Sequence, residues 1–453
     1  MNETAKPAAS RREFLKNTGR IAAASALVGA TVPHVHAAED NTIRLALVGC
    51  GGRGTGAASN ALSVKNGPIK LVAMADIFES RLKGRAAALA KRFAAQCDVP
   101  DDRKFLGFDA YRKAMDCLKP GDVVILATPA AFRWVHLTYA IEKGLNVFME
   151  KPVTNDGPTT RRMFKLAEEV DKKNLKVGVG LMVRHCRGRQ ELFERIKGGE
   201  IGELIALRGY RMCGRACVCG PPAEGENELL YQIRNFHKFL WAGGGIFSDF
   251  YIHQIDELCW MKDAWPVSAH AVGGRHFRGD YVDQNFDSYG VEYTFPDGTK
   301  FFYNGRAISG CHNEFASYVH GTKGAAIVST SSHAPGRVRT FKGHHFTKEE
   351  LIWGPPQEPN PYQLEWDDLI AAIRQDKPYN EVARGAQASM VTSMGRMAGH
   401  TGQIISYDQI LNCEHEMAPD LDKLTMDSPA PVQMAANGKY PVPQPGINKK
   451  REY

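Results

Sequence analysis

The chain has 453 residues, of which 43% are hydrophobic and 24% charged, values typical of a soluble protein with two domains. Its formal net charge is +7, but residues 1–38 contribute +3, so about +4 is spread over the rest of the chain. No long basic run is present, and nucleic acid is therefore excluded as an expected partner.

Residues 1–38 have the features of an export signal. The segment 10–16, SRREFLK, resembles the twin-arginine consensus at every position. A mild apolar stretch follows at 21–32, and 35–38 is a small-residue cleavage site. The apolar stretch is too short to span a membrane, and no later segment is long enough. We therefore predict a signal peptide at 1–38 and a mature protein in the periplasm without stable membrane insertion.

From residue 42 to about 180, short apolar strands alternate with helices. Such alternation is typical of right-handed βαβ units, so we expect a doubly wound parallel sheet of the Rossmann type. The expected strands are 43–49, 69–75, 122–128, 146–149 and 176–181, and the expected helices are 55–64, 79–96, one that carries His136, and 159–172.

From 181 to 412 the strands come in adjacent pairs. Pro296-Asp297-Gly298 is a hairpin signal between two of them. We therefore expect an α+β domain with a large open antiparallel sheet. The expected strands are 288–295, 299–306, 314–320 and 325–329. They are followed by a loop-rich region at 335–365, helices at 366–374 and 383–399, and a Pro-rich extended tail at 413–453.

A glycine-rich motif, Gly49-Cys-Gly51-Gly52-Arg53-Gly54, separates the first strand from the first helix. Its glycines permit a tight turn, close approach of a pyrophosphate to the backbone, and close packing of helix on strand. Asp76 ends the next strand, where a carboxylate binds ribose hydroxyls and repels a 2′-phosphate. This context predicts NAD rather than NADP as cofactor; the alternative is a purely structural glycine-rich turn.

Two further motifs carry candidate catalytic groups. Glu150-Lys151-Pro152 follows a parallel strand, at the edge of the sheet where such folds bind ligands. Asp249 and His253 are four residues apart and share one helix face, behind the glycine run 243–245. Oxidation of an alcohol needs a base, which His253 suits, with Asp249 orienting it and Lys151 stabilising the developing alkoxide. Taken alone, Glu150-Lys151-Pro152 is more typical of a surface turn, and His253 is more typical of an ordinary helix-face histidine.

Together the motifs resemble the glucose-fructose oxidoreductase/inositol dehydrogenase/rhizopine catabolism (Gfo/Idh/MocA) family. The resemblance covers about residues 42–410 and rests on the glycine motif, Thr128-Pro129 with His136 after it, 144–152, and 243–256. It implies an NAD-dependent oxidoreductase acting on a sugar or polyol, with Lys151, Asp249 and His253 as the catalytic set. Relatives form dimers or tetramers, so we expect a homo-oligomer. Some relatives are NAD-dependent glycosidases acting by transient oxidation, elimination and re-reduction, which is the alternative activity for a glycoside substrate.

The predicted site therefore contains a cofactor-binding group and a catalytic group but no metal. The cofactor-binding residues are Gly49, Gly51, Gly52, Arg53, Gly54, Asp76, Thr128, Pro129, His136, Glu150 and Lys151. Weaker candidates for the substrate pocket are Arg184, His185, Arg234, Asn235 and His237. Asp256 is as compatible with a structural cap or ion pair as with a role in the site. Cys213, Cys217 and Cys219 match no standard zinc spacing. Because free NAD is expected to be scarce outside the cytoplasm, an exported enzyme would keep its cofactor bound and regenerate it in each cycle.

Overall fold

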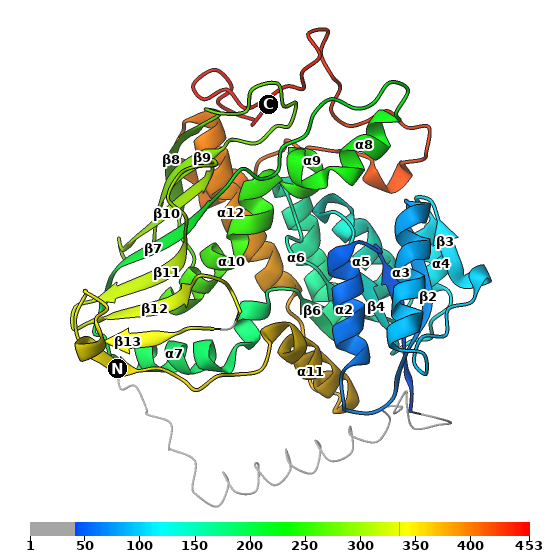
Figure 1. Ribbon diagram of the computed structural model, residues 1–453, viewed down its shortest axis with the longest axis horizontal. Coiled ribbons are helices and arrows are strands. Elements are labelled where there is room, and N and C mark those ends of the chain that lie inside the picture. The colour runs from blue at the N-terminus through cyan, green and yellow to red at the C-terminus, as the bar shows by residue number, and fades with distance from the viewer. Residues whose placement is uncertain (1–40, 335) are drawn as a thin grey trace, which may run out of the picture. The chain divides into compact units, whose positions relative to one another are not determined.

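The structure, a computed structural model, describes residues 41–334 and 336–453, of which 43–453 form one compact unit (Figure 1). The predicted signal peptide, 1–38, lies outside the described residues. Within the described ranges, no helix combines the length and the hydropathy that crossing a membrane requires.

The first sheet has six parallel strands in the order β3-β2-β1-β4-β5-β6. The central pair, β1 (Ile43–Val48) and β4 (Val123–Leu126), is where the strand order reverses, the point at which open α/β sheets bind ligands. The remaining elements are β2 (Ile69–Asp76), β3 (Lys104–Leu106), β5 (Asn146–Met149), β6 (Val177–Val179), α2 (Gly52–Leu62), α3 (Glu79–Arg92), α4 (Ala110–Met115), α5 (Arg133–Glu142) and α6 (Gly157–Lys172). The predicted Rossmann arrangement is confirmed, with β3 and α4 as elements the sequence pattern did not indicate.

The second sheet has nine strands in the order β14-β13-β12-β11-β7-β10-β9-β8-β15. Its strands are β7 (Leu204–Cys213), β8 (Ser268–Gly274), β9 (Ser288–Thr294), β10 (Lys300–Ala307), β11 (Glu314–Gly321), β12 (Ala325–Thr330), β13 (Arg339–Phe341), β14 (Leu351–Trp353) and β15 (Ile405–Ser406). The hairpins β9–β10 and β11–β12 are antiparallel, as predicted. However, β7 and β10 pair in parallel, so the sheet is mixed. The long crossover between these two strands makes a parallel pairing possible.

The region 335–365 is more regular than predicted. It contains the strand pair β13–β14 and the start of α11 (Pro361–Arg374), which begins five residues before the expected position. Asn360 explains the earlier start, because its side chain accepts a hydrogen bond from the Tyr362 backbone N–H and is followed by a proline at the first helical position.

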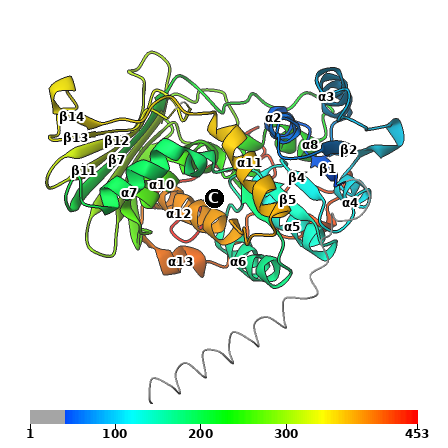
Figure 2. The ribbon, with the colours of Figure 1, turned by 90° about the horizontal axis from the view of Figure 1, so that it is seen from below.

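Two helices from the second half of the chain pack on the first sheet. Trp366 of α11 packs against Phe148 of β5, with ring centroids 4.5 Å apart. In α12 (Val382–Thr401), Ser389 Oγ accepts a hydrogen bond from the Val153 backbone N–H at 3.0 Å. Figure 2 shows α12 and α10 (Gly245–Lys262) lying between the two sheets. Residues of both halves therefore meet along the carboxyl edge of the first sheet.

Candidate functional site

A cavity of about 600 Å³ lies at the carboxyl ends of β1 and β4. Every cofactor-binding and catalytic residue predicted from the sequence lines it. These residues are Gly49, Gly51, Gly52, Arg53, Gly54, Asp76, Thr128, Pro129, His136, Glu150, Lys151, Asp249 and His253. The structure thus brings the glycine motif of the first half and the Asp249–His253 helix of the second half into one cavity.

The glycine motif forms an open cradle at the amino end of α2. Gly49 has φ +97°, and a Cβ on Gly54 would lie 2.0 Å from the Gly49 carbonyl oxygen, so the helix packs directly on the turn. A Cβ on Gly51 would meet no atom within 4 Å. The first turn of α2 has neither a side-chain cap nor an acidic residue, so its N–H groups and the positive end of its dipole remain available. This donor set fits the pyrophosphate of a dinucleotide.

Asp76 lies at the end of β2 beside this cradle. Its Oδ2 accepts a hydrogen bond from the Cys50 N–H at 2.6 Å and its Oδ1 one from the Phe78 N–H at 2.8 Å. Burial raises the pKa of Asp76, while these backbone hydrogen bonds act in the opposite direction. Because each carboxylate oxygen accepts more than one hydrogen bond, Asp76 retains acceptor capacity for a ribose hydroxyl.

Lys151 and Asp249 are in direct contact. Lys151 Nζ donates to the Asp249 carbonyl oxygen at 2.6 Å and lies 3.4 Å from Asp249 Oδ1. His237 Nδ1 lies 2.9 Å from the other carboxylate oxygen. Burial alone would raise the pKa of Asp249, but Lys151 and His237 lower it to about 2. Asp249 is therefore a buried carboxylate that stays ionised and holds the side chains of Lys151 and His237 at the cavity.

His253 lies one helical turn after Asp249 on the same face of α10, as predicted. It is 6% exposed, and its Nδ1 has no hydrogen-bond partner among the described residues. Its ring centroid lies 4.4 Å from that of His333. Burial, followed by the charges of His333 and Lys151, lowers the pKa of His253 well below the ordinary histidine value. His253 therefore faces the cavity as a neutral imidazole, able to accept a proton.

The turn after β4 is held by a buried arginine. Arg133 donates to the Leu126 and Thr128 carbonyl oxygens at 2.5 and 2.8 Å. Thr128 Oγ1 lies 3.2 Å from His136 Nδ1, and the His136 ring packs on that of Tyr111 with centroids 4.4 Å apart. Burial lowers the pKa of His136 to about 3, so this ring is neutral as well. His136 therefore contributes a flat neutral wall to the cavity.

Two family models match this chain. One, described as "Oxidoreductase family, NAD-binding Rossmann fold", matches residues 43–181, and the other, "GFO/IDH/MocA C-terminal domain", matches residues 190–327. Together the two matches cover more than half of the sequence. The chain belongs to the GFO/IDH/MocA oxidoreductase family.

The curated relatives of this GFO/IDH/MocA oxidoreductase include inositol dehydrogenases. The scyllo-inositol 2-dehydrogenase (NAD(+)) of Bacillus subtilis (strain 168) is 27% identical over 312 residues, which are 68% of this chain and 80% of that protein. The inositol 2-dehydrogenase of Corynebacterium glutamicum (strain R) is 27% identical over 164 residues, 36% of this chain; the match spans 42% of that enzyme, less than half of its length.

Among solved structures, scyllo-inositol dehydrogenase from Lactobacillus casei with bound NAD(H) and scyllo-inositol is similar to this chain. The TM-score is 0.58 at 18% identity, and the alignment covers 81% of this chain and 99% of that one. The likeness concerns the fold, and it confirms the pairing of a Rossmann domain with a mostly antiparallel sheet.

Most of the weaker pocket candidates of this GFO/IDH/MocA chain have structural partners outside the cavity. Arg184 forms a two-point ion pair with Asp256 at 2.7 and 2.9 Å. His185 Nδ1 lies 2.8 Å from Asp368, and Arg234 contacts Glu226 at 2.5 Å. Asn235 Nδ2 donates to the Tyr231 carbonyl oxygen at 3.0 Å. Only His237 of this group lines the cavity.

In the described part of the chain, the cysteine-rich segment 213–219 is not gathered with other potential metal ligands. All ten cysteines are free, and the described residues contain no group of three His, Cys, Asp or Glu side chains that could hold a metal ion. The Cys217 carbonyl oxygen instead accepts a hydrogen bond from Asn285 Nδ2 at 3.0 Å. The segment therefore acts through its backbone as a support for the loop that carries Asn285.

Several residues of the cavity carry no signal in the sequence. Tyr362 of α11 carries the Arg53 guanidinium over its ring at 4.5 Å, and Arg53 Nε in turn lies 2.9 Å from Glu150 Oε1. The C-terminal tail adds Leu421, Asp422 and Leu424 to the cavity wall. No motif or periodicity marks these positions, because they reach the site only through the tertiary packing of distant segments.

Proposed function

We propose that this protein is an NAD-dependent oxidoreductase that transfers a hydride between a hydroxyl-bearing carbon of a sugar or polyol and a nicotinamide cofactor. The observation that carries the proposal is the convergence of Lys151, Asp249 and His253 on the cavity that also contains the glycine cradle. A bound nicotinamide supplies the hydride acceptor that no amino-acid side chain provides.

In this proposal each side chain has a separate role. His253 accepts the proton of the substrate hydroxyl, because it lines the cavity and its Nδ1 has no hydrogen-bond partner among the described residues; its lowered pKa leaves the ring neutral. Lys151 donates a hydrogen bond to the same oxygen and stabilises the negative charge that develops there. Asp249 is the anion that fixes Lys151 and His237, and its low pKa keeps it charged throughout the physiological range.

We propose NAD rather than NADP because Asp76 lies where the adenosine ribose is expected. Arg81 also lines the cavity, with its guanidinium 4.6 Å above the Phe78 ring, and is the residue that would favour a 2′-phosphate. Parallel titrations with NADH and NADPH test the choice. Tighter binding of NADH supports it, and tighter binding of NADPH contradicts it.

The activity is tested by incubating the purified protein with inositols, aldoses and glycosides while recording the absorbance of reduced nicotinamide. Formation of an oxidised product (a ketone, or a lactone where an aldose is oxidised at C1) together with reduced cofactor supports the proposal. Release of an aglycone without net oxidation would instead indicate the glycosidase reaction.

We further propose that the protein is exported by the twin-arginine route after loading its cofactor, on the basis of the motif at residues 10–16. Replacing both Arg11 and Arg12 with lysine should leave the full-length protein in the cytoplasm. Cell fractionation followed by immunoblotting measures this, and an unchanged distribution would refute the proposal.

The subunit assembly proposed here is a homodimer or homotetramer formed through the second sheet. Ile205 of β7 and Phe302 of β10 are 53% and 40% exposed, which is consistent with a face that another subunit covers. Light scattering coupled to size-exclusion chromatography gives the mass in solution, and a monomeric mass would contradict this assignment.

A further inference from the structure

The C-terminal tail, residues 413–453, closes one side of the cavity. Its short helix η6 (Leu421–Lys423) contacts η2 (Ala130–Phe132), the segment that follows β4. Leu421 is 4% exposed and belongs to the same apolar cluster as Phe78, Tyr111 and Phe132, and Leu424 packs against that cluster. The tail therefore covers the part of the cavity near Asp76 and Phe78. The adenosine half of a dinucleotide is expected to bind there.

The tail is attached to the rest of the compact unit along its whole length. Figure 1 shows it in orange and red, passing over α8 (Glu228–Arg234) and α9 (Leu240–Gly243) before it ends near α12. Its attachments include the hydrogen bonds from Met417 N–H to Asp156 Oδ2 (3.0 Å), from Gln232 Nε2 to the Val432 carbonyl oxygen (2.6 Å), from Gln284 Nε2 to the Pro441 carbonyl oxygen (2.8 Å) and from Lys439 Nζ to the Asp280 carbonyl oxygen (2.9 Å).

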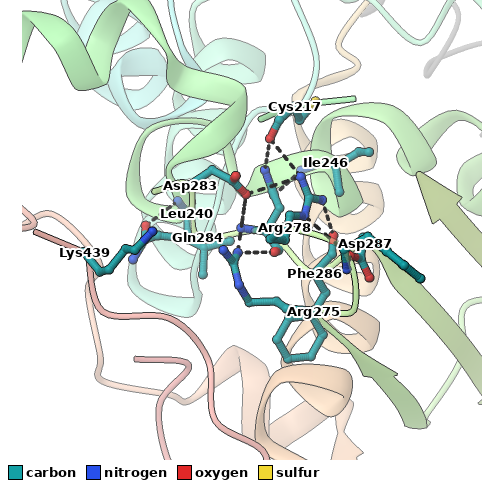
Figure 3. Close-up of polar contacts among 12 residues, drawn as sticks. Cys217, Leu240, Ile246, Arg275, Arg278, Asp283, Gln284, Phe286, Asp287 and Lys439 are labelled. Carbon is teal, nitrogen blue, oxygen red and sulfur yellow. Dashed lines mark hydrogen bonds and ion pairs between the residues drawn. The ribbon is translucent and has the colours of Figure 1, made fainter. Parts of the chain in front are cut away.

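The loop 275–287 contains Asp280 and Gln284, which make two of these attachments, and it also contacts α10, the helix that bears His253 (Figure 3). Asp283 is fully buried and lies 3.4 Å from Arg275 and 3.5 Å from Arg278. Asn285, in the same loop, accepts a hydrogen bond from the Ile246 N–H at the start of α10 and donates one to the His237 carbonyl oxygen at 3.0 Å. The tail and the helix that bears His253 therefore rest on one rigid support.

The end of the tail is fixed by a buried ion pair. Glu452 is 3% exposed and accepts hydrogen bonds from Arg396 Nη2 at 2.8 Å and Nε at 2.9 Å, while His400 Nδ1 lies 2.5 Å from it. Arg396 also donates to Ser248 Oγ of α10 at 2.6 Å. A glutamate is seldom buried unless it is paired, so the pairing of Glu452 with Arg396 specifies the path of the tail.

We propose that the tail is part of the cofactor-binding site, with Leu421 and Leu424 contacting the bound dinucleotide and slowing its release. Both family matches end before the tail begins, so the matched segments do not include this wall of the site. The inference rests on the nucleotide binding of the proposed function but not on its substrate. A cofactor that leaves slowly is also what an exported enzyme needs when free NAD is scarce.

The test is the rate at which the protein without residues 1–38 releases NADH. This rate is measured by stopped-flow fluorescence during displacement with excess NAD, without any substrate. Leu424→Ala and Leu421→Ala should each accelerate release about tenfold, because each removes most of an apolar side chain from the contact. Met426→Ala is the matched control, since Met426 lies in the same tail, is 43% exposed and does not line the cavity. It should release NADH at the wild-type rate.

Leu424 is only partly buried, so its variant keeps the test decisive if Leu421→Ala fails to fold. Release by Leu424→Ala within twofold of wild type would overturn the inference, and so would equal acceleration by Met426→Ala. If the wild type oxidises a polyol while the variants release NADH unchanged, only the tail inference fails. If the variants release NADH faster but no polyol or sugar is oxidised, the tail inference stands and the proposed function fails.

Discussion

Replacing Gly51 and Gly54 separately with alanine distinguishes a cofactor cradle from a structural turn. The added methyl group at position 51 meets no protein atom within 4 Å, and Gly51 has φ −71°, which alanine adopts readily. At position 54 the methyl group would lie 2.0 Å from the Gly49 carbonyl oxygen. The first change therefore fills only the space expected to hold the pyrophosphate, whereas the second forces helix and turn apart.

The expected magnitudes differ accordingly. Gly51→Ala should change the free energy of unfolding by less than about 1 kcal/mol, since a lost capping preference and a stiffer unfolded chain oppose each other. It should weaken NADH binding by tenfold or more, which corresponds to about 1.4 kcal/mol or more. Gly54→Ala should lower the free energy of unfolding by roughly 1–3 kcal/mol, the usual cost of overpacking.

Urea denaturation of the nucleotide-free protein measures the first quantity, and titration with NADH by fluorescence measures the second. Wild-type NADH affinity in a folded Gly51→Ala protein would refute the placement of the pyrophosphate at this cradle. Full stability of Gly54→Ala would refute the packing argument alone.

Three further predictions concern the catalytic group and the tail anchor. His253→Gln should lower kcat by about 10²–10⁴ with little change in NADH affinity, and Lys151→Met should lower kcat by a similar factor; a loss of affinity without a loss of kcat would contradict their catalytic roles. Because burial, His333 and Lys151 lower the pKa of His253 well below 6.5, kcat/KM for oxidation should stay level as the pH falls from 8 to 6, and a decline centred near 6.5 would contradict this. Burial alone would raise the pKa of Glu452, but Arg396 and His400 lower it from 4.5 to about 2. The stability that this ionised carboxylate contributes is therefore present above about pH 4.5 and is lost as the pH falls towards 2. Glu452→Gln should therefore cost about 3 kcal/mol in urea denaturation at pH 7 and less at pH 3, and equal losses at both would count against the ion pair.

The parts of the site that depend on local pattern were predictable from the sequence. A glycine-rich turn between an apolar strand and a helix has few structural alternatives, and Asp249 and His253 share a helix face because of the helical repeat. Apart from the edge strand β3, the strands of the first sheet are largely apolar runs because both of their faces are buried. These features needed no knowledge of distant contacts.

The remaining features depend on contacts between segments far apart in the chain. His237 lies in the short 3₁₀ helix η4 (Phe236–Lys238), and only the folded chain brings it to Asp249. The parallel pairing of β7 with β10 depends on a crossover whose direction strand patterns do not encode. The tail has no periodicity, so its composition predicts an extended segment but not its attachment at Glu452 or its position beside the cavity.

The second half of the chain packs against the first half and contributes to the same cavity, which couples nucleotide binding to folding. Tyr362 of α11, Asp249 and His253 of α10, and Leu421 of the tail line one cavity with the glycine cradle. A ligand that contacts all of these elements binds only when they are assembled, so it stabilises the folded state over partly opened states by mass action. A chain proposed to cross a membrane already folded would gain from such coupling, because cofactor loading would then precede and favour the compact state that is exported. Thermal unfolding of the mature protein should accordingly shift to higher temperature in a single transition as NADH is added, and a shift confined to one of two separate transitions would show that the halves are not coupled.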